Sequence, residues 1–253
     1  GELLVKTPDD ISSLQVPVVK ETPCLVEALK TIHSLRERTE NDTLVPGAVI
    51  SPFSLPIIQM GFPAYIELMY EQPNLFNKLM AVNQEYCVSW ANAQLEAGAM
   101  AIGYCDPLAS PTFLPLDMYL KTGFKIAQET CARINGPTSV GLVSSNCLPA
   151  LDVLAALGTK AVGAGPFENL AEVKAVCQGR FTVLGGLNGV EMHTWTPEEA
   201  TEKVKEALAE AAVGGGFILS DNHEIPWQVS EEVLMSISET VHKWGRYPIC
   251  PHN

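Results

Sequence analysis

Short apolar runs alternate along the chain with longer segments that have the apolar periodicity of helices. Two of the runs, Ser139–Val143 and Phe217–Leu219, do not alternate polar and apolar positions, which is typical of strands buried on both faces of a parallel sheet. The predicted strands are Gly47–Ser51, Met100–Cys105, Thr138–Val143, Lys160–Ala164, Phe181–Gly185 and Gly216–Ser220. The predicted helices are Pro23–Arg38, Asn74–Ala97, Leu116–Ile134, Pro149–Leu157, Asn169–Cys177, Pro197–Val213 and Ser230–Trp244.

This alternation predicts repeated right-handed βαβ units and therefore an α/β fold. An eight-stranded barrel would need about two more strands, and the segment before Leu44 offers no convincing one. The pattern leaves an incomplete barrel and an open doubly wound sheet as alternatives. With no repeat and no low-complexity linker, the 253 residues fit one domain, 1–253, in which 1–43 is poorly assigned.

The chain is acidic, with 16 Lys and Arg residues against 29 Asp and Glu residues, a formal net charge of −13. Phosphate binding needs clustered basic side chains, so this balance argues against a nucleic-acid partner. It argues equally against an anionic membrane surface. A small anionic ligand is not excluded, because one pocket can differ in charge from the whole molecule.

The seven cysteines are odd in number and irregularly spaced, and no C-x-x-C occurs. A disulfide framework is therefore not expected, and a reducing cytoplasm is the predicted location. The N-terminus lacks the basic-then-apolar pattern of a signal peptide. Since no run of 18 apolar residues occurs, we expect no membrane span.

In both architectures the chemistry lies at the carboxyl ends of the strands. Asp106 follows a predicted strand directly, and could bind a ligand, accept a hydrogen bond or act as a base. Its simpler role would be to cap the next turn. His223 lies in a polar loop after the last predicted strand, and histidine serves as a base or as a neutral metal ligand.

Cys147 follows the third predicted strand, where a thiolate could bind a metal or act as a nucleophile. A free cysteine is more often simply buried. The sequence has no G-x-G-x-x-G after a strand, and no G-x-S-x-G, H-E-x-x-H or G-x-x-x-x-G-K-[ST]. The commonest hydrolase, metalloprotease and nucleotide-phosphate sites are therefore not predicted.

Four stretches carry a family pattern: Ile50-Ser51-Pro52-Phe53-Ser54-Leu55; Leu95-Glu96-Ala97-Gly98-Ala99 followed by Asp106-Pro107 and Ala109-Ser110-Pro111; Val183-Leu184-Gly185-Gly186-Leu187-Asn188; and Leu219-Ser220 through Ile225-Pro226. They resemble the uroporphyrinogen decarboxylase superfamily. The similarity is closest to its branch of methylcobamide:coenzyme M methyltransferases and related corrinoid-dependent methyltransferases. The D-P-x-A-S-P stretch is the one most specific to this branch.

The resemblance implies a (β/α)8 TIM-type barrel, and it implies that this chain lacks the family's N-terminal segment. Decarboxylase members place a substrate-binding Arg motif and a key Asp in that segment. Methyltransferase members use zinc, held by an H-x-C pair and a later Cys, to turn the acceptor thiol into a thiolate. Here Leu142 and Ser144 stand at the H-x-C positions, and His223 stands at the position of the later Cys.

The resemblance therefore implies methyl transfer from a methyl-corrinoid, on a corrinoid protein or as free methylcobalamin, to a small thiol or similar acceptor. The predicted catalytic residues are His223 and Asp106. The predicted substrate-binding residues are Tyr104, Ser110, Asn188, Asn222 and Glu224.

Three alternatives stay open for this site. It could hold zinc rebuilt on His223 and Cys147, it could be metal-free with His223 as the base, or the protein could be a non-catalytic relative that binds a corrinoid or another ligand. A lyase acting on a porphyrinogen carboxylate is the other enzyme class. A homo-oligomer is a further expectation, because an unclosed barrel edge invites a partner strand.

Overall fold

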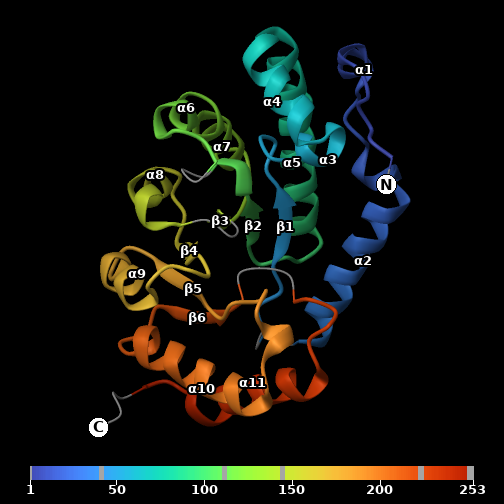
Figure 1. Cartoon of the computed structure of the whole chain (residues 1–253). Coiled ribbons are helices and arrows are strands. Elements are labelled where there is room, and N and C mark those ends of the chain that lie inside the picture. The colour runs from blue at the N-terminus through green and yellow to red at the C-terminus, as the bar shows by residue number, and fades with distance from the viewer. Residues whose placement is uncertain (1, 40–42, 110–112, 143–145, 222–224, 250–253) are drawn as a thin grey trace. The chain divides into compact units, whose positions relative to one another are not determined.

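The structure is a computed structural model that describes residues 2–39, 43–109, 113–142, 146–221 and 225–249 (Figure 1). Its strands follow one another across one sheet in chain order, without the reversal that marks a doubly wound sheet. Strand β1 pairs with β2 in parallel, and successive strands from β3 to β6 also pair in parallel. The α/β class and the six predicted strands are confirmed, and the strand order is that of the barrel alternative. The strands are β1 (Gly47–Ile50), β2 (Ile102–Cys105), β3 (Thr138–Gly141), β4 (Ala161–Gly163), β5 (Thr182–Gly186) and β6 (Phe217–Ser220).

Helices and short helical turns connect these strands, and each predicted helical segment contains at least one of them. None of the described helices is long and apolar enough to cross a membrane. The longer helices are α1 (Pro8–Ser13), α2 (Pro23–Arg38), α3 (Pro56–Met60), α4 (Phe62–Glu71), α5 (Pro73–Glu96), α6 (Leu116–Lys121), α7 (Gly123–Cys131), α8 (Leu151–Ala156), α9 (Leu170–Cys177), α10 (Pro197–Ala207) and α11 (Glu231–Trp244). The short turns are η1 (Val19–Glu21), η2 (Pro107–Ala109), η3 (Leu148–Ala150), η4 (Met192–Thr194) and the π-helical η5 (Leu208–Ala212).

The prediction of one helix over Leu116–Ile134 is wrong, because α6 and α7 are separate helices that meet at Thr122. Thr122 leaves the helical region, with φ −119° and ψ −89°. Gly123 follows it and packs so closely that an added Cβ would lie 3.0–3.1 Å from Phe53, Ala109 and Tyr119. Close packing of the chain at this glycine therefore breaks a periodicity that looks continuous in the sequence.

Helices α3 and α4 were not predicted, because each is too short for a clear periodicity. Gly61 separates them with φ +83°, a conformation that glycine adopts at little cost. Helix α1 was also missed, although Thr7 and Asp10 form a capping box at its start.

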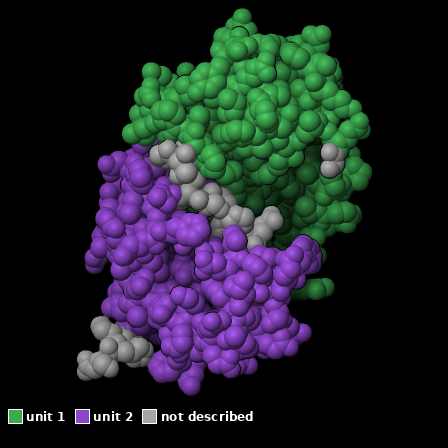
Figure 2. Space-filling view, viewed as in Figure 1, with its two compact units in different colours: residues 1–109, 113–139 green, residues 110–112, 140–253 purple. Residues whose placement is uncertain are grey.

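The chain divides into two compact units, and Figure 2 colours them differently. Unit 1 comprises residues 1–109 and 113–139, and unit 2 comprises residues 110–112 and 140–253. The boundary falls within β3. Compactness alone does not make a unit a separate domain, so the single-domain organisation stays a prediction.

In unit 1, β1 packs against α5 and pairs with β2. Buried Val49, Ile102 and Tyr104 on the strands belong to the same core as Leu79 and Ala91 on α5. The N–H groups of Gly47 and Ser51 bond to β2, so the polar groups of Ala48 point to the other edge of β1. There the Gln94 side chain, on α5, accepts from the Ala48 N–H at 2.9 Å and donates to its carbonyl at 3.0 Å. One buried amide thus covers the outer edge of this strand.

In unit 2, β4, β5 and β6 lie beside α9, α10 and α11. The core between them includes Val183, Phe217, Val204, Ala211 and Val233, which are all buried. Strand β6 is the outer strand of the described sheet. Its Phe217 carbonyl accepts a hydrogen bond from the Tyr247 hydroxyl at 3.1 Å.

Candidate functional site

Asp106 lies directly after β2, with 1% of its surface exposed. The parallel register pairs Ile50 with Cys105, which places Ser51, the residue directly after β1, beside Asp106. The hydroxyls of Ser51 and Ser54 both donate to Oδ1 of Asp106, at 2.5 Å and 2.7 Å. The described residues provide no hydrogen-bond partner for Oδ2. One carboxylate oxygen is therefore held by two donors, and the other is enclosed without a partner among the described residues.

The turn after β1 explains why the two serines converge on this carboxylate. The Ser54 N–H donates to the Ser51 hydroxyl oxygen at 2.9 Å, and the Leu55 N–H donates to the Ser51 carbonyl at 2.9 Å. The Ser54 hydroxyl also accepts from the Leu108 N–H at 3.1 Å, which ties the turn to the segment after Asp106. The carboxyl group is thus fixed by two strand ends at once.

Burial raises the pKa of Asp106 from 3.8 to about 7, because the charged form loses its hydration. The hydroxyls of Ser51 and Ser54 oppose this rise by stabilising the carboxylate. A carboxyl group with this pKa can take up or give up a proton near neutral pH.

Two tyrosines of unit 1 have fully buried side chains whose hydroxyls have no hydrogen-bond partner among the described residues: Tyr104 on β2 and Tyr119 on α6. Burial raises the pKa of both hydroxyls, and the charge of Asp106 raises it further. The core around the end of β2 therefore contains three polar side chains with unmet hydrogen-bonding capacity, which is unusual in a folded protein.

Cys147 is buried in unit 2, just before η3. Its backbone N–H and that of Leu148 donate to the carboxylate of Glu168, at 2.9 Å and 3.0 Å, and the Gly165 N–H donates to the same carboxylate at 2.7 Å. Burial raises the pKa of the Cys147 thiol, and the neighbouring charge of Glu168 raises it further. This environment favours the neutral thiol over the thiolate that a metal or a nucleophilic role requires.

The zinc donor set implied by the resemblance does not fit the described residues. Leu142 is buried and has no atom that could bind a metal. Within the described ranges, no three His, Cys, Asp or Glu side chains are close enough to share a metal ion. The predicted site residues His223, Ser110, Asn222 and Glu224 lie outside the described residues.

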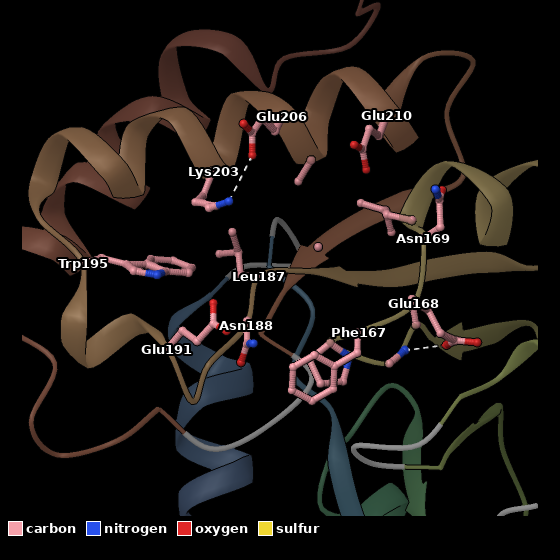
Figure 3. Close-up of a pocket in the computed structure, with 16 residues that line it drawn as sticks. Phe167, Glu168, Asn169, Leu187, Asn188, Glu191, Trp195, Lys203, Glu206 and Glu210 are labelled. Carbon is pink, nitrogen blue, oxygen red and sulfur yellow. Dashed lines mark hydrogen bonds and ion pairs between the residues drawn. The ribbon is translucent and has the colours of Figure 1, made fainter. Parts of the chain in front are cut away.

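Asn188 lines a cavity of about 310 Å³ in unit 2 (Figure 3). Lys203 and Glu206 on α10 and Glu210 on η5 lie on one side of this cavity, and Asn188 and Glu191 lie on the other. Lys203 pairs with Glu206 at 3.4 Å. The Asn188 side chain accepts from the Val190 N–H at 3.2 Å, so it also stabilises the turn after β5.

Residues 2–244 match the sequence model of the uroporphyrinogen decarboxylase (URO-D) family. The chain belongs to this family.

Curated relatives in the family include two kinds of enzyme. Uroporphyrinogen decarboxylase from Cellvibrio japonicus is 27% identical over 250 residues, which cover 94% of this chain and 68% of that protein. Methylcobamide:CoM methyltransferase MtaA from Methanosarcina barkeri is 27% identical over 116 residues, 46% of this chain and 33% of that protein. Both identities are low, so they do not decide between the two activities.

Among solved structures, a methyltransferase from Methanosarcina mazei superposes with a TM-score of 0.79 and 18% identity, covering 93% of this chain and 69% of that one. A B12-independent methionine synthase from Shewanella superposes with a TM-score of 0.55 and 14% identity, covering 85% and 66%. At these identities the likeness shows the fold alone, and the fold is that of the URO-D family.

Within this URO-D fold, Tyr104 and Asp106 lie in unit 1, and Cys147 and Asn188 lie in unit 2. Glu168 connects the second pair, because it binds the backbone at Cys147 and lines the cavity that contains Asn188. Sequence reasoning did not assign roles to the residues that complete these groups, which are Ser51, Ser54, Tyr119 and Glu168. For the two serines a signal existed, because they lie where a strand ends and have spare hydroxyls.

Proposed function

We propose that this protein transfers a methyl group from a methyl-corrinoid, free or bound to a corrinoid protein, to a small thiol or similar acceptor. The observation that carries the proposal is Asp106, a buried carboxyl group at a strand end, with one oxygen held by two serines and the other without a partner among the described residues. Support also comes from the methylcobamide:CoM methyltransferase among the relatives and from the methyltransferase fold neighbour.

The role proposed for Asp106 is that of a general base. A thiol with an ordinary pKa of about 8.5 is mostly protonated at pH 7, so it must lose its proton to become a strong nucleophile. The Asp106 carboxylate takes that proton on Oδ2, while the sulfur forms a bond to the methyl carbon. The corrinoid, as substrate, supplies the methyl group, and its cobalt retains the electron pair of the broken carbon–cobalt bond.

The proposed base sets the pH dependence of the reaction. Because the pKa of Asp106 is raised to about 7, the carboxylate becomes the main form only above neutral pH. The rate should therefore rise with pH through about 7 and level off above it. His223, which lies outside the described residues, stays the predicted alternative base. A zinc site rebuilt on His223 and Cys147 also stays a prediction, although burial of Cys147 favours its neutral thiol over the thiolate that zinc binds.

The remaining roles carry over from the sequence as proposals. Substrate contacts are assigned to Tyr104, Ser110, Asn188, Asn222 and Glu224. A corrinoid protein as partner, a homo-oligomer and a cytoplasmic location also stay predictions.

The direct test is incubation of the purified protein with methylcobalamin and a panel of small thiols, followed through the absorbance of the cobalt centre. Thiol-dependent loss of the methylcobalamin spectrum, together with the methyl thioether detected by mass spectrometry, is expected. Heat-denatured protein and a reaction without thiol are the controls. If every thiol leaves the spectrum unchanged at pH 6, 7 and 8, the proposed activity is refuted.

A decarboxylase is the second candidate, because a uroporphyrinogen decarboxylase aligns over 94% of this chain. Such an enzyme needs cations to hold the carboxylates of its substrate. Two arginines are engaged in ion pairs, Arg133 with Glu85 and Arg180 with Asp152, each at 2.7 Å. Incubation with uroporphyrinogen distinguishes the two functions, since release of CO₂ without methyl transfer would favour the decarboxylase.

A further inference from the structure

Unit 2 contains a second and larger cavity, of about 570 Å³, between β6 and α11. Its size is within the usual range of small-molecule pockets. None of its lining residues belongs to the Asp106 network, which lies in unit 1, and neither the predicted activity nor the comparisons assign a role to these residues. Its lining consists of Leu187, Met192, Ile218, Leu219, Ser220, Asp221, Ile225, Leu234, Ile237, Ser238, Val241 and His242.

Most of this cavity wall is apolar. Leu187 and Met192 are buried, while Ile218, Ile225 and Leu234 keep 47%, 50% and 36% of their surface exposed. Branched aliphatic side chains left this exposed around a concavity provide area that an apolar ligand can cover. The cavity therefore suits the hydrocarbon part of a ligand.

The polar groups of the cavity point to the other part of the ligand. Asp221 lies directly after β6, and its Oδ2 atom is enclosed without a hydrogen-bond partner among the described residues. Removing a carboxylate oxygen from water without giving it a hydrogen-bond donor costs free energy of folding. Asp221 as a whole is half-buried and lines the cavity, so a ligand with a hydrogen-bond donor can meet its carboxylate while Oδ2 itself stays enclosed.

The charge of the cavity lining determines which kind of hydrogen-bond donor the ligand can carry. No Lys or Arg is among the described residues that line the cavity, so an anionic ligand would meet Asp221 without a compensating cation. Nδ1 of His242 lies 2.8 Å from the carbonyl oxygen of Ser238, which can only accept, so Nδ1 carries the proton. In the neutral ring Nε2 is then an acceptor, as the Asp221 carboxylate is.

From this geometry we propose that the cavity between β6 and α11 binds an apolar amine in its protonated form. The ammonium N–H donates to the Asp221 carboxylate, and the hydrocarbon part lies against Ile218, Ile225 and Leu234. A quaternary ammonium ion would bind less well, because it has no N–H to donate.

The test measures binding by isothermal titration calorimetry with three probes of one shape: benzylammonium, benzyl alcohol and benzoate. Benzylammonium should bind at least about tenfold more tightly than benzyl alcohol, and benzoate should bind least. Asp221→Asn should weaken benzylammonium binding by about tenfold or more and should leave benzyl alcohol nearly unchanged. Glu239→Gln is the matched control, since it removes an exposed carboxylate of α11 that does not line the cavity.

A second variant protects the test against misfolding of Asp221→Asn. Leu234→Lys changes a partly exposed position of the cavity wall and brings a positive charge to it. It should weaken benzylammonium binding and strengthen benzoate binding, while circular dichroism reports an unchanged fold. The proposal is overturned if benzylammonium does not bind the wild-type protein, or if it binds the wild type and both variants equally well. Because no methyl transfer is measured, the outcome is independent of the proposed function.

Discussion

Two aspartates occupy equivalent places in this molecule, since Asp106 follows β2 in unit 1 and Asp221 follows β6 in unit 2, each one residue after its strand. In both, Oδ2 is enclosed without a partner among the described residues. Asp106 receives two serine hydroxyls on Oδ1, whereas Asp221 lines a cavity whose walls are mostly aliphatic. The chemistry of a strand-end carboxylate is therefore decided by what the neighbouring segments bring to it.

The outer strands of the described sheet differ in a related way. A buried Gln94 satisfies both backbone groups of Ala48 on β1. On β6, the Phe217 carbonyl is bound by a tyrosine hydroxyl, and the following residues line the larger cavity. One edge is covered by a side chain from a packed helix, and the other borders a space that a ligand can enter.

The largest expected effect comes from removing the proton acceptor of unit 1. Asp106→Asn keeps the shape of the side chain and loses the base, so the rate of methyl transfer should fall by about 100-fold or more. Stopped-flow absorbance of methylcobalamin at pH 8 measures this rate. Asp117→Asn, which changes an exposed carboxylate on α6, should leave it unchanged. Equal rates for wild type and Asp106→Asn would remove Asp106 from the mechanism.

The raised pKa of Asp106 also predicts how stability depends on pH. The folded state binds this proton more tightly than the unfolded chain does, so the stabilising contribution is complete below about pH 4 and is lost as pH rises through about 7. The free energy of unfolding should fall over this window by ~1.4 kcal/mol for each unit of pKa difference. Urea unfolding of wild type and Asp106→Asn at pH 5 and pH 8 isolates the contribution. If the free energy of unfolding of the wild type falls no more steeply with pH than that of Asp106→Asn, this result contradicts the raised pKa assigned to Asp106.

The comparison of the two edges predicts a third effect. Gln94→Met preserves length but removes both hydrogen bonds to the backbone of Ala48, so at about 1 kcal/mol for each bond unfolding should become easier by about 2 kcal/mol. Gln128→Met is the control, because Gln128 is exposed on α7. Chemical denaturation monitored by circular dichroism measures both. If the two variants lose equal stability, the amide of Gln94 does not protect the edge.

The smallest expected effect tests the serines. Ser51→Ala removes a donor that lowers the pKa of Asp106, so the midpoint of the pH–rate profile should move to higher pH. Ser54→Ala should move it in the same direction and should also loosen the turn at Leu108. Ser89→Ala, on α5, should leave the midpoint in place. A shift to lower pH would contradict the hydrogen bonds assigned to Asp106.

Several elements were predictable because their signals are local. The six strands are short apolar runs, and α2 and α11 carry clear periodicity with capping residues at or near their starts. The break between α6 and α7 was not predictable, because it depends on Gly123 packing against Phe53, which is distant in the chain. The position of Asp106 followed from the strand that precedes it, but its serine partners depend on the register between β1 and β2.

The sequence by itself determined the α/β class, the positions of the six strands and the family resemblance, because apolar periodicity and short motifs are written in neighbouring residues. Only the tertiary structure decided the order of the strands in the sheet, that Cys147 is a buried neutral thiol, that Asp106 has one oxygen held by two serines and one without a partner among the described residues, and that Asp221 borders a cavity. The physical reason is that protonation and hydrogen bonding depend on burial and on partners tens of residues away, and these are fixed only when the strands pair and the helices pack.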